Sequence, residues 1–163
     1  MTDETTRATR AFETHGSFEQ DGPDAFAVTT TPFDATVRTD DDRVTVRLPT
    51  LDAVVAGETV ADVVERGWYE TLERRLDDAH TVAETDDVSP AELTREDDAA
   101  VLTVAFESTP SPHDALAVVE YAEGTWLQGV VPGYEYREPA ASLVKRARQN
   151  YDDDGDGTER GGE

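Results

Sequence analysis

Residues 33–48 read Phe-Asp-Ala-Thr-Val-Arg-Thr-Asp-Asp-Asp-Arg-Val-Thr-Val-Arg-Leu. On both sides of the three aspartates, apolar residues alternate with polar ones. Alternation with a period of two is typical of strands that bury one face. Aspartates between two such runs favour a turn. The stretch therefore predicts an antiparallel hairpin whose second face, with Thr36, Arg38, Thr45 and Arg47, is polar.

Further strands and helices are expected on both sides of this hairpin. Phe26 and Val28 alternate with their neighbours and predict another strand, and residues 101–106 form an apolar run suited to a buried one. Residues 79–88 are expected to be extended, residues 89–98 to form a connection or an edge strand, and residues 16–24 a loop. Helices are expected over residues 3–15, 59–78, 111–124 and 139–150.

The helix expected over residues 59–78 has the most regular pattern. Its apolar residues recur every fourth position from Val60 to Leu76, and Thr59 with Asp62 resembles a capping box. Gly67 in its middle costs up to about 1 kcal/mol relative to alanine. Close packing of the helix on the sheet is the favoured reason for this glycine, and a kink is the alternative. In the next helix, Ser111 caps the start and Gly124 is expected at the end.

This order of elements predicts an α+β fold with a mainly antiparallel sheet of about five strands and three to four flanking helices. The order resembles the small fold of the type III secretion chaperones. The length suits a single domain over residues 1–150. Residues 151–163 are rich in Asp and Gly and are expected to form a disordered acidic tail.

The charge of the chain restricts its habitat and its partners. The chain carries 37 Asp and Glu against 14 Lys and Arg, a net charge of −23, and Lys145 is its only lysine. Hydrophobic residues make up 37% of the chain and fall in periodic segments, so the chain should fold once salt screens this charge. An acidic, lysine-poor surface resembles that of proteins from salt-accumulating haloarchaea. Duplex nucleic acid, which binds through many Lys and Arg contacts, is not expected as a partner.

No apolar run is long enough to cross a membrane, and Met1-Thr2-Asp3-Glu4 does not begin a secretory signal, so a cytoplasmic protein without a membrane partner is expected. The absence of cysteine excludes disulfides and thiolate chemistry.

No residue pattern points to catalysis, a cofactor or a bound metal. The sequence has no Walker loop, no dinucleotide-binding fingerprint and no nucleophile elbow. The three histidines, His15, His80 and His113, are not at metal-ligand spacing and are expected to be structural. Asp152, Asp154, Asp156, Gly157 and Glu163 match a calcium loop, but the chain ends where an exiting helix should begin, and a solvated tail is favoured.

Residues 125–137 are apolar and aromatic around a Pro-Gly turn. Trp and Tyr are enriched where proteins bind proteins. The residues Trp126, Val130, Tyr134 and Tyr136 are therefore the candidate partner-binding site. The alternative, which is favoured, is that this segment completes the core against the last helix.

Residues 130–136, with Glu138-Pro139 and Ala141-Ser142-Leu143 after them, resemble an uncharacterised haloarchaeal protein family over most of residues 5–150. The resemblance implies a habitat and one folded domain, and no catalytic residue. The function predicted is a non-enzymatic protein-binding module, adaptor-like or chaperone-like, that binds a protein partner or a second copy of itself. The alternative is a small-molecule-binding protein or enzyme with a pocket between sheet and helices.

Overall fold

The computed structural model describes residues 2–131 and 133–147, and residues 2–6 by their backbone alone. The helices are α1 (Thr2–Thr14), α2 (Leu51–Val54), α3 (Asp62–Leu76), the 3₁₀ helix η1 (Ala79–Val82), α4 (Pro112–Gln128) and a final helical segment over residues 140–147. The strands are β1 (Phe18–Gln20), β2 (Ala25–Val28), β3 (Asp34–Arg38), β4 (Arg43–Pro49), β5 (Val55–Ala56), β6 (Glu92–Glu96), β7 (Ala99–Ala105) and β8 (Glu135–Tyr136).

Six strands form one sheet in the order β1-β2-β3-β4-β7-β6, and all neighbours are antiparallel. The predicted α+β class and the predicted hairpin are confirmed, with Val37 opposite Val44 and Ala35 opposite Val46. The expected edge strand is β6. A separate two-stranded ladder joins β5 to β8.

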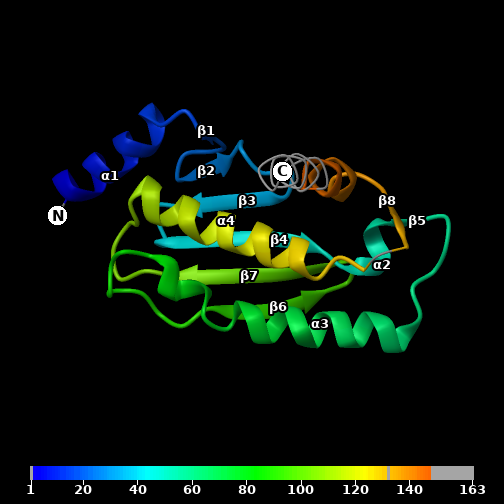
Figure 1. Ribbon diagram of the computed structural model, residues 1–163. Coiled ribbons are helices and arrows are strands. Elements are labelled where there is room, and N and C mark those ends of the chain that lie inside the picture. Colours follow the sequence, from blue (N-terminus) through cyan, green and yellow to red (C-terminus); the bar gives the residue numbers. More distant parts are fainter. Residues whose placement is uncertain (1, 132, 148–163) are drawn as a thin grey trace, which may run out of the picture.

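The helices cover one face of this sheet (Figure 1). Helix α4 crosses the middle of the sheet, α1 lies over β1 and β2, and α3 lies beside β6. The sheet residues beneath them are fully buried, as Phe26, Val44 and Leu102 show. Burying one such side chain stabilises the fold by roughly 1.5–3 kcal/mol.

Residues 16–24, expected to be a loop, contain the edge strand β1. Phe18 explains the difference, because its ring meets that of Phe12 on α1 edge-on at a centroid distance of 4.8 Å. Phe12 also stacks on Phe26 at 5.5 Å. This aromatic cluster holds residues 18–20 in the sheet although their own sequence has little strand character.

Helix α3 starts three residues later than the sequence predicts, and no side chain caps it. The backbone N–H of Val60 donates to Asp52 Oδ1 at 2.9 Å, so residues 59–60 are held against α2 and not in the helix. Gly67 is exposed, and a Cβ built there meets nothing within 4 Å. The expected close packing at Gly67 is therefore wrong.

Helix α4 begins as predicted, with Ser111 Oγ accepting from the N–H of Asp114, but it does not end at Gly124. It continues to Gln128 because Thr125 and Trp126 are buried on its inner side. Their burial outweighs the cost of about 1 kcal/mol for a glycine inside a helix. The expectation that residues 79–88 are extended is also wrong at its start, where η1 buries Ala79.

Candidate functional site

Trp126, the first residue of the predicted partner-binding site, lies in the core. Its side chain is 1% exposed, and its indole N–H donates to the carbonyl oxygen of Pro49 at 2.9 Å. Its ring meets Phe33 edge-on at 5.3 Å and Tyr136 at 6.4 Å. Trp126 therefore joins the last turn of α4 to the end of β4 and has no surface to offer a partner.

The other three residues of that site, Val130, Tyr134 and Tyr136, are half-buried and pack against the core. The Tyr136 hydroxyl donates to the carbonyl oxygen of Val131 at 2.9 Å and accepts from its N–H at 3.0 Å. These bonds close the segment on itself, while β8 pairs with β5. The segment thus fills space beside the sheet, and partner binding through its exposed parts stays a prediction.

The side of the sheet opposite the helices is uncovered (Figure 1). We call it the bare face. On the inner strands β2, β3, β4 and β7 it consists of Ala25, Ala27, Asp34, Thr36, Arg38, Arg43, Thr45, Arg47, Val101, Thr103 and Ala105. Thr36, Thr45 and Thr103 stand opposite one another on three adjacent strands, with Ala27 next in the row. The middle of the bare face therefore carries small, uncharged side chains.

Arginines stand above and below this threonine row. Arg38 lies opposite Arg43, and Arg47 lies opposite Asp34. Glutamates occupy the two edge strands, with Glu19 beside Ala27 and Glu92 beside Thr103. In a chain of charge −23, the two central strands of this face thus carry three arginines against one aspartate.

Each of these arginines pairs with carboxylates of its own chain, from the turn between β3 and β4 or from the end of β6 and the turn after it. Arg38 pairs with Asp40 at 3.0 Å, Arg43 with Asp41 at 3.3 Å, and Arg47 with Glu96 at 3.1 Å and Asp98 at 3.2 Å. The hydrogen bond that Arg38 donates to Asp40, together with the charge of Asp40, raises the pKa of Arg38, and the hydrogen bond that Arg47 donates to Glu96 raises the pKa of Arg47. All these side chains are 40% or more exposed, so the pairs contribute little to stability.

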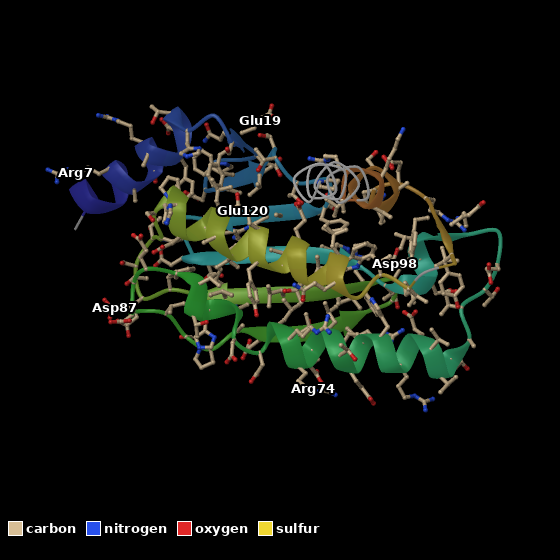
Figure 2. The ribbon with its side chains drawn as sticks, viewed as in Figure 1. Arg7, Glu19, Arg74, Asp87, Asp98 and Glu120 are labelled. Carbon is tan, nitrogen blue, oxygen red and sulfur yellow. The ribbon has the colours of Figure 1, made fainter. Side chains whose placement is uncertain are left out.

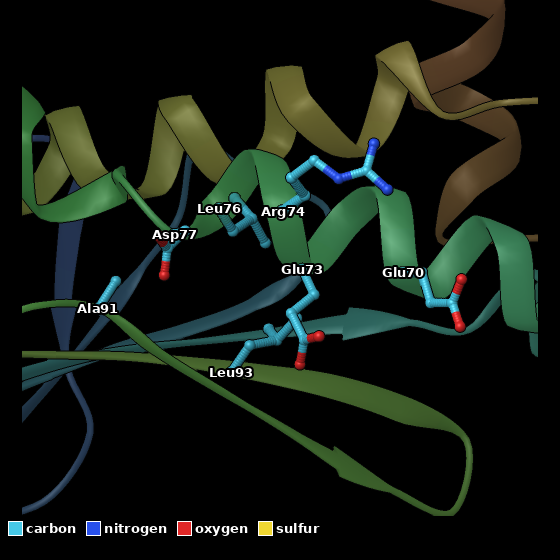
Figure 3. Close-up of a pocket in the computed structure, with 7 residues that line it drawn as sticks. All are labelled: Glu70, Glu73, Arg74, Leu76, Asp77, Ala91 and Leu93. Atoms are coloured by element: carbon cyan, nitrogen blue, oxygen red, sulfur yellow. The ribbon is translucent and has the colours of Figure 1, made fainter.

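The clefts of the described residues are open and mixed in polarity. Figure 3 shows a groove of about 520 Å³ between α3 and β6, where Glu70, Glu73 and Asp77 lie over Ala91 and Leu93. A smaller cleft of about 280 Å³ at the end of the sheet is lined by Phe33, three prolines and Arg47. Neither cleft contains a histidine or a hydroxyl group that could serve as a nucleophile beside a base.

Two carboxylates of the described residues, Glu65 and Asp114, are buried. Glu65 on α3 is 7% exposed, and its Oε2 accepts from the N–H of Asp52 at 3.0 Å. Its Oε1 lies 3.5 Å from Nη2 of Arg95, whose guanidinium lies 5.4 Å from the ring centroid of Tyr69. Burial raises the pKa of Glu65, against the lowering effect of the Asp52 N–H. Glu65 therefore ties α3 to α2 and β6, and it lines neither cleft.

Among the described residues, one group has the donor set for a metal ion. The ligand atoms of Glu84, His113 and Asp114 all lie within 4.8 Å of one another. Sequence reasoning missed this group because Glu84, in the loop after η1, is far along the chain from the start of α4. The other histidines have backbone partners, since Nδ1 of His15 accepts from Ser17 N–H and Nδ1 of His80 from Ala91 N–H.

The predicted calcium loop and the predicted disordered tail fall on residues 151–163, which lie outside the described residues. None of the helices in the described part of the chain is long and apolar enough to cross a membrane.

Comparison with known proteins identifies a family. A model described as a family of unknown function (DUF5813) matches residues 13–146. No curated protein and no solved structure matches the chain, so the likeness to type III secretion chaperones stays a prediction. The match includes the whole sheet, both long helices α3 and α4, and residues 130–143, which carry the family resemblance. The chain therefore belongs to this family of unknown function.

Proposed function

We propose that this chain is a non-enzymatic protein-binding module that works in concentrated salt, and that an acidic protein docks on the bare face of its sheet. The observation that carries the proposal is the one-sided cover of the sheet, because α1, α3 and α4 lie over one face and leave the other open (Figure 1). An antiparallel sheet can face water on one side. The bare face also differs from an ordinary acidic surface, because its two central strands carry three arginines against one aspartate.

The chemistry of the bare face favours an acidic partner. Its middle, with Thr36, Thr45 and Thr103, has no charge to desolvate, which resembles the charge-depleted centre of protein interfaces. The arginines around it can form paired hydrogen bonds with carboxylates of the partner. Arg38, Arg43 and Arg47 now hold exposed carboxylates of their own chain, and exchanging one exposed pair for another costs little.

Concentrated salt suits this mode of binding. At about 1 M salt the Debye length is roughly 3 Å, so long-range repulsion between two acidic proteins is largely screened. An arginine and a carboxylate at hydrogen-bond distance are about one Debye length apart, so their attraction is not lost to this screening. The net charge of −23 thus opposes association with an acidic partner in dilute buffer and hardly at all in molar KCl.

A photo-crosslinking residue placed at Thr45 tests the site of docking. The matched control places the same residue at Arg66, which is exposed on α3, over the other face of the sheet. In halophile lysate at molar KCl, we expect the Thr45 probe to trap an acidic protein other than this chain, and the Arg66 probe to trap none. The variant Arg43→Glu should reduce trapping by the Thr45 probe, whereas Arg66→Glu should not.

Three results would overturn the proposal. The first is the same trapped proteins from both probes, and the second is no product from the Thr45 probe. The third is a product of twice the mass of the chain, which would assign the bare face to a second copy.

A small-molecule ligand is the second candidate, supported by the cleft of Phe33, three prolines and Arg47. An apolar floor with one guanidinium suits an anionic ligand, but Asp34, Asp98 and Glu138 also line this cleft. Arg47, however, already holds Glu96 and Asp98. Those carboxylates oppose an anionic ligand there, so protein binding is the better-supported function.

A further inference from the structure

We propose that Glu84, His113 and Asp114 bind one Zn²⁺-like transition-metal ion at the start of α4. The site joins the loop that follows η1 to the first turn of this helix. One imidazole nitrogen and two carboxylates make up the donor set. Three protein ligands leave one position of a four-coordinate ion for water.

The distances fit a shared ion. Two ligand atoms at about 2.0–2.2 Å from a tetrahedral ion lie roughly 3.3–3.6 Å apart. Nε2 of His113 and Oε1 of Glu84 are already 3.5 Å apart. All three ligand atoms lie within 4.8 Å of one another, so a small rotation of the exposed side chains of Glu84 and His113 completes the set.

Asp114 is the fixed member of the group, and it has spare ligand capacity. The residue is 5% exposed, and its backbone N–H donates to Ser111 Oγ at 3.1 Å. Its Oδ1 accepts from the N–H of Glu84 at 2.8 Å, whereas no described residue donates a hydrogen bond to its Oδ2. Among the described residues, no fully buried side-chain oxygen or nitrogen lacks a partner, so Oδ2 of Asp114 still reaches solvent. This oxygen is therefore open to a metal ion.

The type of donor decides the type of ion. Hard ions such as Mg²⁺ and Ca²⁺ prefer oxygen ligands, whereas imidazole suits Zn²⁺, Co²⁺ and Ni²⁺. The positive end of α4, about half an elementary charge, opposes any cation, but the two carboxylates outweigh it. Coordination by the imidazole of His113 also separates this site from the many exposed carboxylates of the chain, which carry no nitrogen.

Titration with ZnCl₂ tests the site. The full chain in molar KCl, with excess Mg²⁺ to occupy nonspecific carboxylates, is followed by calorimetry, and Co²⁺ replaces Zn²⁺ for visible absorption. We expect one ion per chain and a rise in melting temperature on binding. His113→Ala and Glu84→Gln should each weaken binding by at least about tenfold. Glu107→Gln, at an exposed position outside the group, has the same charge change as Glu84→Gln and should leave the affinity unchanged.

The variant Asp114→Asn keeps an acceptor for the N–H of Glu84 and guards against loss of the helix start. It should fold, as circular dichroism would show, and still lose Zn²⁺. Absence of saturable Zn²⁺ binding to the wild type would overturn the proposal. So would Zn²⁺ affinity that His113→Ala leaves unchanged, or that Glu107→Gln lowers as much as Glu84→Gln does.

Discussion

Glu65 shows how a buried charge couples the stability of this fold to pH. Because burial raises its pKa in the folded state, the folded chain binds a proton more readily than the unfolded chain, where glutamate titrates at about 4.3. Between these two pKa values the folded state holds more protons, so the contribution of Glu65 to stability falls as pH rises. At neutral pH its charge opposes folding, and its bonds to Asp52 N–H and Arg95 offset part of that cost.

Glu65→Gln should therefore change the pH profile of stability. We expect the free energy of unfolding of the wild type, relative to the variant, to be higher just above pH 4 than at pH 7. Urea unfolding at both pH values measures this difference. Glu70→Gln, which changes an exposed carboxyl on the same helix, serves as the control. Its free energy of unfolding should change with pH in parallel with that of the wild type.

Trp126 makes the second prediction at this scale. Trp126→Phe keeps an aromatic ring between Phe33 and Tyr136 but leaves the carbonyl oxygen of Pro49 without its indole donor. An unsatisfied buried group costs about 1–3 kcal/mol, and the smaller ring adds the cost of a cavity. Urea unfolding of Trp126→Phe should show this loss.

Trp68→Phe is the matched control for the hydrogen bond, since Trp68 is 6% exposed and its indole N–H makes no bond within the described chain. Equal losses of unfolding free energy in Trp126→Phe and Trp68→Phe would contradict the importance of the hydrogen bond to Pro49.

At the scale of elements, glycines in and after the helices have opposite roles. Gly67 lies inside α3 with nothing within 4 Å of an added Cβ, whereas a Cβ at Gly129 would lie 3.2 Å from Nε1 of Trp68. Gly67→Ala should stabilise the protein by about 0.5–1 kcal/mol, because it removes the entropic cost of a glycine in a helix.

Gly129→Ala should destabilise the protein, because Trp68 of α3 packs against the end of α4 and has little room to move. Chemical denaturation of both variants checks the pair. Stabilisation by Gly129→Ala would mean that the approach of Trp68 to α4 is looser than 3.2 Å implies.

The sequence predicts the elements best where their pattern is local. The hairpin of β3 and β4, with its alternation and its aspartate turn, is confirmed together with its polar face. The end of α4 and the strand β1 were not predicted, because Trp126 and Phe18 take their positions from residues distant in the sequence. The local sequence predicts that the helix ends at Gly124, but burial of Thr125 and Trp126 extends it to Gln128.

For the whole molecule, charge is the dominant feature. Carboxylates project from strands, helices and loops alike, as Glu19, Glu120, Asp87 and Asp98 show in Figure 2. Such a shell repels itself in dilute buffer and favours expansion of the chain. In molar KCl the repulsion is screened, so the fold should be much more stable there.

Thermal unfolding in dilute buffer and in molar KCl tests this dependence. We expect the melting temperature to fall by at least about 10 °C in dilute buffer, a change that corresponds to roughly 3–5 kcal/mol for a chain of this size. A variant with several exposed Asp and Glu replaced by Asn and Gln should lose most of the difference. An equal melting temperature for the wild type in both buffers would contradict the role of screening.

The fold class could be predicted from sequence, whereas the candidate sites could not. Trp126 was a candidate partner-binding residue, but the favoured alternative placed it in the core, and it is buried there. The alternation around Thr36 and Thr45 predicted a polar face, but nothing in it marked that face as a docking surface. Which face the helices cover depends on how α1, α3 and α4 pack together. The convergence of Glu84 with His113 likewise follows from packing of η1 on α4.

The strand order has a consequence for synthesis of the chain. Strands β1 to β4 pair with their neighbours in sequence, but the second partner of β4 is β7, which begins at Ala99. At about 5–20 residues per second, a ribosome needs roughly 3–10 s to make the intervening residues. During that interval the nascent sheet ends in an unpaired strand with an apolar face. Arg43 and Arg47 lie on that strand, and their charges disfavour its pairing with another nascent copy before β7 emerges.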